Sequence, residues 1–168
     1  MQIVKIPAER IPILNSYLRQ VEEKGDIELS VSAEEGVSIK SADPIAEWKA
    51  VSVIKAIGRG FDPSTAVKLF SDDYVFNLIN LKEAFDKEKQ RIRVRSRLIG
   101  TKGKTRATIE EVSGANVCIY KNTIGFIGKP EEVAMAVEAA SMIINGVNHT
   151  TVYMFLRKER KKLEQNRL

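Results

Sequence analysis

The sequence predicts an α+β protein of two tandem β-α-α-β-β-α modules, followed by a C-terminal helix. Short runs of alternating apolar residues predict strands, and longer runs with apolar residues every three or four positions predict helices. The same order of strands and helices occurs twice along the chain. The prolines that begin the last helix of each module, Pro44 and Pro130, are 86 residues apart. This spacing indicates an internal repeat.

The first module is expected over residues 1–60. Its final helix has the clearest start signal, because Asp43 is a good N-cap and Pro44 suits the first helical position. The predicted elements are a strand at 2–6, helical residues at 8–24, strands at 27–31 and 37–40, and a helix at 44–58.

A connector helix is expected over residues 61–73, the second module over 74–146 and a basic C-terminal helix over 147–168. Within the second module, Gly114 follows its helix as a C-terminal cap would. The predicted elements are a strand at 75–81, a charged loop at 86–90, helices at 92–98 and 107–113, strands at 115–119 and 123–127, and a helix at 130–145.

The positive charge is concentrated in the second half of the chain. Residues 1–84 have a formal net charge of −3 and residues 85–168 one of +8, which together give the +5 of the whole chain. The basic residues are densest at 87–106, where nine of twenty are Lys or Arg and one is acidic. Basic runs are often only solvated surface, but one that leads into a glycine-rich loop favours nucleic acid as the partner.

The composition also excludes several classes of protein. A single cysteine, Cys118, leaves no disulfide to hold the fold and no cysteine cluster for a metal. No apolar run approaches the roughly 20 residues of a membrane span, and the N-terminus lacks the long apolar centre of a signal peptide. We therefore expect a cytoplasmic protein without a membrane partner, and we expect neither a metal site nor a cofactor.

The loop Gly100-Thr101-Lys102-Gly103 is the candidate functional motif. Glycines allow the backbone to pass close to a partner, and the N–H groups of the helix that follows favour an anion. Lys102, Lys104 and Arg106 add positive charge. The pattern is short, and a simple helix-to-helix turn is an alternative interpretation. A nucleotide-binding P-loop is excluded because position 98, where that motif requires glycine, is Leu.

The second module resembles the KH (K-homology) RNA-binding module. The resemblance rests on residues 99–105, Ile-Gly-Thr-Lys-Gly-Lys-Thr, on residues 109–111, Ile-Glu-Glu, and on residues 113–115, Ser-Gly-Ala. Arg106 departs from the general KH pattern, which has an apolar residue there, and resembles the ribosome-assembly branch called partner of Nob, or Dim. Residues 57–61, 79–81 and 152–153 resemble the same branch, in an archaeal version.

This resemblance implies a non-enzymatic protein that binds single-stranded RNA, namely the 3′ region of small-subunit ribosomal RNA in the pre-ribosomal small subunit. It also implies contact with the processing endonuclease and with a translation initiation factor. Phosphate contacts are expected from the loop and its basic neighbours, and base contacts from an adjacent apolar groove. The candidate RNA-binding residues are Arg97, Ile99, Gly100, Thr101, Lys102, Gly103, Lys104, Arg106, Ile109 and Val117.

The first module departs from the pattern. The residues at 15–18, Asn-Ser-Tyr-Leu, stand where the glycine loop would be, and the segment is about four residues too short. We expect a KH-like fold that has lost its loop and that contacts protein or supports the second module. Alternatives for the whole chain are a KH-fold protein adaptor, an exosome-like RNA-binding subunit and, less favoured, a nuclease or nucleotide-dependent enzyme, for which catalytic residues are lacking.

The uneven charge predicts that RNA binds the second half of the chain. Residues 85–168 contain the glycine loop and the net charge of +8, so they should bind single-stranded RNA, and residues 1–84 should bind it far more weakly. Titration of each half with the same oligonucleotide checks this, and comparable affinities would contradict it.

Overall fold

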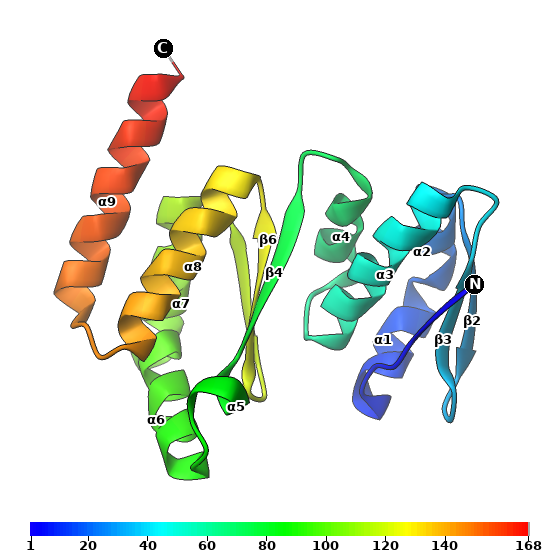
Figure 1. Cartoon of the computed structure of the whole chain (residues 1–168), viewed down its shortest axis with the longest axis horizontal. Coiled ribbons are helices and arrows are strands. Elements are labelled where there is room, and N and C mark those ends of the chain that lie inside the picture. The colour runs from blue at the N-terminus through cyan, green and yellow to red at the C-terminus, as the bar shows by residue number, and fades with distance from the viewer. Residues whose placement is uncertain (168) are drawn as a thin grey trace. The chain divides into compact units, whose positions relative to one another are not determined.

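The computed structural model describes residues 1–167, which form two compact units, Met1–Phe76 and the chain from Asn77 onward. Each unit contains a three-stranded sheet with helices against one face (Figure 1). The strand orders are β1-β3-β2 and β4-β6-β5, so the third strand of each module lies in the middle of its sheet. The predicted fold class, two β-α-α-β-β-α modules and a C-terminal helix, is confirmed.

The first unit follows the predicted order closely. Its last helix begins at Pro44, where the Asp43 side chain accepts a hydrogen bond from the backbone N–H of Ile45 at 2.9 Å. The elements are β1 (Gln2–Val4), η1 (Ala8–Arg10), α1 (Ile11–Ser16), α2 (Leu18–Gly25), β2 (Glu28–Ser32), β3 (Gly36–Lys40), α3 (Pro44–Gly58), α4 (Pro63–Ala66) and η2 (Val67–Phe70).

The first module has no glycine loop between its first two helices. α1 and α2 meet at Tyr17, whose backbone has φ −121° and ψ 13°. Both β1 and β2 pair antiparallel with β3, and the helices pack on the sheet through buried side chains such as Leu14, Val21 and Ile54. The module therefore keeps the fold, but its first two helices meet without the glycine loop of the second module.

The predicted connector forms α4 and η2, which lie against the helices of the first unit. Leu69 in η2 is buried, and the ring of Phe70 lies so close to Gly25 that a Cβ at position 25 would collide with it. The segment is thus packed as part of the first unit rather than extended as a free linker.

The second unit differs from the expected elements in several places, and α7 begins at Lys104, three residues earlier than predicted. α6 begins at Glu88, four residues earlier than predicted, so the charged segment is partly helical. A short helix also follows β4, where the Asn80 side chain accepts a hydrogen bond from the Lys82 N–H at 3.0 Å. The elements are β4 (Val75–Asn80), α5 (Leu81–Ala84), α6 (Glu88–Ile99), η3 (Thr101–Gly103), α7 (Lys104–Ser113), β5 (Asn116–Tyr120), β6 (Thr123–Gly128), α8 (Pro130–Ile144) and α9 (His149–Asn166).

The strand β4 changes where the chain should be divided for experiments. It lies beside β6 at one edge of the second sheet, and a fragment that begins at residue 85 lacks it. Separate halves should therefore be divided before Val75, near Ser71, so that the second sheet keeps all three strands.

One continuous apolar core includes side chains of the second sheet, α6, α7, α8 and the start of α9, and α9 lies on the side of α7 and α8 away from the sheet (Figure 1). Phe126 on the central strand β6 is completely buried, as are Val152 and Leu156 on α9. α9 packs along α7 and α8, so the C-terminal helix is part of the domain and contacts the helix that follows the glycine loop. Among residues 1–167, the apolar stretches of the helices are too short to cross a membrane.

Truncation of Phe126 should destabilise the second unit strongly. Its side chain is 0% exposed, and removal of a buried phenylalanine side chain costs about 3–5 kcal/mol in the free energy of unfolding. The exposed Met154, at 64%, provides the control, since Met154→Ala should change this free energy by less than about 0.5 kcal/mol. Urea unfolding followed by circular dichroism compares the two variants, and equal midpoints would contradict the assigned core.

Candidate nucleic-acid interface

The glycine loop, Gly100–Gly103, joins the end of α6 to the start of α7. Its backbone turns sharply through three residues with positive φ: Gly100 at 77°, Lys102 at 56° and Gly103 at 75°. The Gly103 N–H donates to the Gly100 carbonyl at 3.1 Å, which closes the turn. No side chain within the described chain caps the first turn of α7. The loop is thus a tight turn that leaves the start of a helix accessible.

The two glycines have different structural roles. A Cβ at Gly100 would collide with Thr105, lying 2.7 Å from its backbone nitrogen. A Cβ at Gly103 would meet no atom within 4 Å. Gly100 is therefore required by the packing of the protein itself, whereas the space beside Gly103 is open to a partner.

Thr105 and Tyr153 fix the loop to the C-terminal helix. Thr105 is 3% exposed, and its hydroxyl shares a hydrogen bond of 3.1 Å with the Tyr153 hydroxyl on α9. His149 on α9 donates through Nε2 to the backbone carbonyl of Arg97 at 2.9 Å. Contacts from α9 thus hold both sides of the loop in place.

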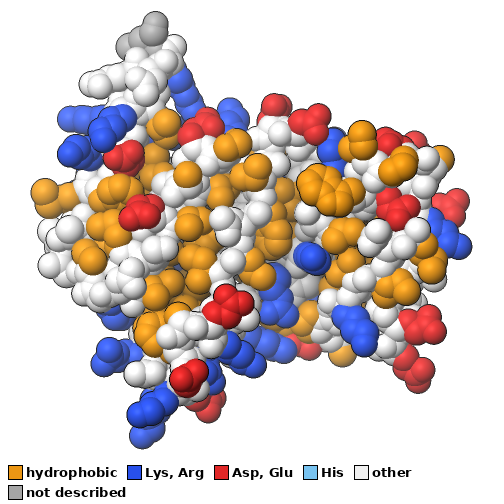
Figure 2. Space-filling view, in the orientation of Figure 1, with side chains coloured by type: hydrophobic (Ala, Val, Ile, Leu, Met, Phe, Trp, Pro, Cys, Tyr) orange, Lys and Arg blue, Asp and Glu red, His pale blue; other side chains and the backbone are white. Residues whose placement is uncertain are grey.

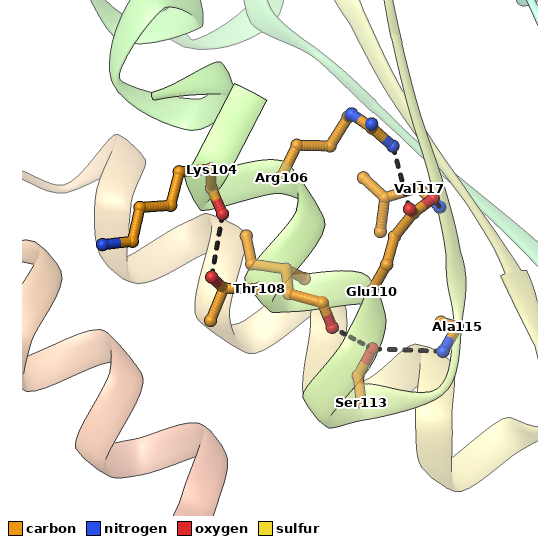
Figure 3. Close-up of polar contacts among 8 residues, drawn as sticks. Lys104, Arg106, Thr108, Glu110, Ser113, Ala115 and Val117 are labelled. Carbon is orange, nitrogen blue, oxygen red and sulfur yellow. Dashed lines mark hydrogen bonds and ion pairs between the residues drawn. The ribbon is translucent and has the colours of Figure 1, made fainter. Parts of the chain in front are cut away.

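Polar contacts also hold α7 to the neighbouring strand β5 (Figure 3). One oxygen of Glu110 accepts a hydrogen bond from the backbone N–H of Val117 at 2.8 Å, and the other lies 2.9 Å from the Arg106 guanidinium. At the end of α7 the Ser113 hydroxyl accepts from the Ala115 N–H at 3.1 Å. Arg106 is therefore paired with a carboxylate at the edge of the predicted groove.

Three of the arginines on α6 have structural partners. Arg97 donates to the carbonyls of Ile143 and Val147, both at 2.7 Å. Arg95 donates to the Lys121 carbonyl at 2.8 Å, and Arg91 donates to two carbonyls near the start of its own helix. Arg97 stays a predicted RNA contact, although its guanidinium holds α6 to the end of α8 and the residues after it.

Other basic side chains near the loop have no such partner. Within residues 1–167, the side chains of Arg93, Lys102 and Lys104 form no hydrogen bond or ion pair. Lys104 and Arg106 leave α7 in opposite directions, Arg106 towards β5 and Lys104 away from it (Figure 3). The loop therefore has basic residues on two sides, one towards β5 and one away from it.

The predicted apolar groove residues differ in exposure. Ile99 at the end of α6 is 36% exposed, whereas Ile109 is 1% and Val117 is 5% exposed. Ile99 offers apolar surface next to the loop, and the other two belong to the core beneath it. Their contact with bases stays a prediction.

On the Lys104 side of the loop lies a recess of about 470 Å³ between α6, the start of α7 and α9. The sequence did not predict it. The period of an α-helix could have predicted that Arg93 and Ser96 lie on one face of α6, the face that leads to the loop. No signal in the sequence, however, predicts that α9 packs beside this face. Its lining residues include Arg93, Ser96, Lys104, Thr105, His149 and Tyr153.

The described residues contain no group of three or more His, Cys, Asp or Glu side chains that could hold a metal ion. Basic side chains are prominent instead, and they gather around α6 and over α9 (Figure 2). The surface of the second unit is thus suited to an anionic partner.

The family description "Eukaryotic type KH-domain (KH-domain type I)", in its form for the second domain of PNO1, matches residues 75–161. These residues contain the glycine loop and both helices that flank it, which defines the class as a KH-domain protein. The chain is 37% identical over 175 aligned positions to the KH domain-containing protein MJ0443 of Methanocaldococcus jannaschii, with 99% of this chain and 77% of that protein covered.

A second relative, the pre-rRNA-processing protein PNO1 of Phaeosphaeria nodorum, is 30% identical over 128 residues, which cover 75% of this chain and 49% of that protein. Among solved structures, the chain is similar to one in the a/eIF2alpha-aDim2p-rRNA complex from Pyrococcus horikoshii OT3, with a TM-score of 0.87, 35% identity and 96% and 94% coverage of the two chains. The chain belongs to the archaeal Dim/PNO1 family of KH-domain ribosome-assembly proteins.

The different surroundings of the two glycines predict different costs of substitution. Gly103→Ala should lower the free energy of unfolding by about 1–2 kcal/mol, because alanine is strained at positive φ. Gly100→Ala adds a collision with the Thr105 backbone and should cost clearly more. Urea unfolding measures both, and equal costs would show that α7 moves to accommodate a Cβ at position 100.

Proposed function

We propose that this protein binds single-stranded RNA through the glycine loop of its second module and does so during maturation of the small ribosomal subunit. The RNA is the 3′ region of small-subunit ribosomal RNA. The protein itself performs no catalysis. By holding this region, it assists the processing endonuclease that trims the RNA.

The observation on which the proposal rests is the open space beside Gly103 at the start of α7. No atom lies within 4 Å of a Cβ position there, no described side chain caps the helix, and the exposed Lys102 stands next to it. A phosphodiester can therefore approach the backbone closely, where the helix dipole and the lysine both favour an anion. KH domains hold about four nucleotides of backbone at such a loop.

The relatives support the biological setting of the proposal. One is described as a pre-rRNA-processing protein, and the similar aDim2p was crystallised with rRNA and a/eIF2alpha. We therefore propose ribosomal RNA in the pre-ribosomal small subunit, the processing endonuclease and a translation initiation factor as partners. The first module, which has no glycine loop, is proposed to contact protein.

Two aspartates in the loop should abolish RNA binding without unfolding the protein. Thr101 and Lys102 are both exposed, and aspartate tolerates the positive φ of residue 102 better than most residues do. Thr101→Asp/Lys102→Asp places two negative charges where the phosphates would lie. Fluorescence anisotropy with an oligonucleotide that copies the 3′ end of small-subunit rRNA should show at least a tenfold loss of affinity.

The matched control is Lys161→Asp/Gln165→Asp, which makes the same change of net charge at exposed positions of α9. It should bind RNA within about threefold of the wild type. Melting curves establish that both variants are folded. Undiminished RNA affinity of the folded loop variant would contradict the proposal. A wild-type protein that does not bind RNA would instead favour the alternative function of a protein adaptor.

A further inference from the structure

The recess on the Lys104 side of the glycine loop has features of a second nucleotide-binding surface. It lies between α6, the first residues of α7 and the start of α9, with a volume of about 470 Å³. Its residues belong to the second unit, and the side chain of Lys104, which lines it, points away from β5, whereas that of Arg106 points towards β5 (Figure 3). The loop borders the recess, and the groove predicted beside β5 would lie on the other side of the loop.

The charge of the recess is positive. Arg93, Arg97 and Lys104 line it, and none of its described lining residues is acidic. Arg97 is engaged by two carbonyls, whereas the Arg93 and Lys104 side chains have no hydrogen-bond or ion-pair partner within residues 1–167. Two cations without a carboxylate are therefore available to an anionic group.

The recess also contains two aromatic rings from α9. The rings of His149 and Tyr153 lie 6.1 Å apart, centre to centre, at an interplanar angle of 52°. Both are anchored by their polar atoms, Tyr153 through Thr105 and His149 through the Arg97 carbonyl. Rings held in this way are ordered before a ligand arrives, and aromatic faces bind nucleobases by stacking.

We propose that this recess binds one further nucleotide of the RNA strand, adjacent to those held by the glycine loop. Its phosphate lies at Arg93 and Lys104, and its base stacks on the ring of Tyr153, with His149 beside it. This inference rests on the proposed function, because the strand must first be held at the loop. Lys104 is assigned to this nucleotide rather than to the groove, since its side chain points away from β5 (Figure 3).

The location of the recess makes the proposal sensitive to RNA length. About four nucleotides suffice to occupy a KH loop and groove, so a four-nucleotide strand should not need the recess. A ten-nucleotide strand can extend past the loop into it. Loss of the recess should therefore weaken binding of the longer strand and leave that of the shorter one unchanged.

The test compares Tyr153→Leu with Tyr153→Phe in the full chain. Leucine removes the aromatic face, and phenylalanine keeps the face but loses the hydrogen bond to Thr105. Tyr153→Leu should weaken the ten-nucleotide complex roughly 5- to 150-fold, as loss of one stacked base does, whereas Tyr153→Phe should stay within threefold of the wild type. Arg93→Ala should reduce the slope of log affinity against log salt by about 0.7.

Photo-crosslinking identifies the nucleotide in contact. Ten-nucleotide strands with one 5-iodouridine at successive positions should give a crosslink to Tyr153 or His149 at one position, beyond those that crosslink near the loop. If Tyr153→Leu and Arg93→Ala bind the long strand normally while Thr101→Asp/Lys102→Asp does not bind it, the proposed nucleotide site in the recess is wrong. The proposed function is then unaffected. A wild type that binds neither strand would contradict both the nucleotide site in the recess and the proposed function.

Discussion

The second module depends on the close approach of Gly100 to the backbone of Thr105. Because no side chain fits between them, α6 can end and α7 can begin within four residues, and Thr105 is directed inwards to meet Tyr153. The same turn leaves Gly103 facing open space and the first turn of α7 uncapped by a side chain. This steric constraint thus sets the path of the chain around the loop, directs Thr105 to its contact with α9 and leaves open the surface at which we propose RNA binds.

The arginines of α6 show that positive charge has two uses in this domain. Arg91, Arg95 and Arg97 donate to backbone carbonyls and hold the helix to its surroundings. Arg93 and the two lysines near the loop remain available for an anion. The number of basic residues in the sequence is therefore larger than the number that can contact phosphates. Only the hydrogen-bond partners in the structure distinguish the structural arginines from the basic residues that are available to an anion.

The two modules show what the glycine loop adds to a shared fold. Both have the same strand order and the same arrangement of helices on one face of the sheet. In the first, the helices meet at Tyr17 without a positive-φ turn, so this junction does not form the open glycine turn seen in the second module. The repeat thus preserves the packing scheme, which depends on apolar periodicity, while the feature suited to binding depends on a few residues in one loop.

The sequence by itself determined most of the elements, their repeated order and the position of the loop, because periodicity, helix caps and glycines act over short distances along the chain. It predicted the helix from Pro44 and the one from Pro130 to within a residue or two. It did not determine which basic side chains are free, how deeply Ile109 and Val117 are buried, or that α9 places Tyr153 and His149 beside the loop. These features join residues about 50 positions apart, so only the tertiary structure, in which the core packs α9 against α7, could decide them.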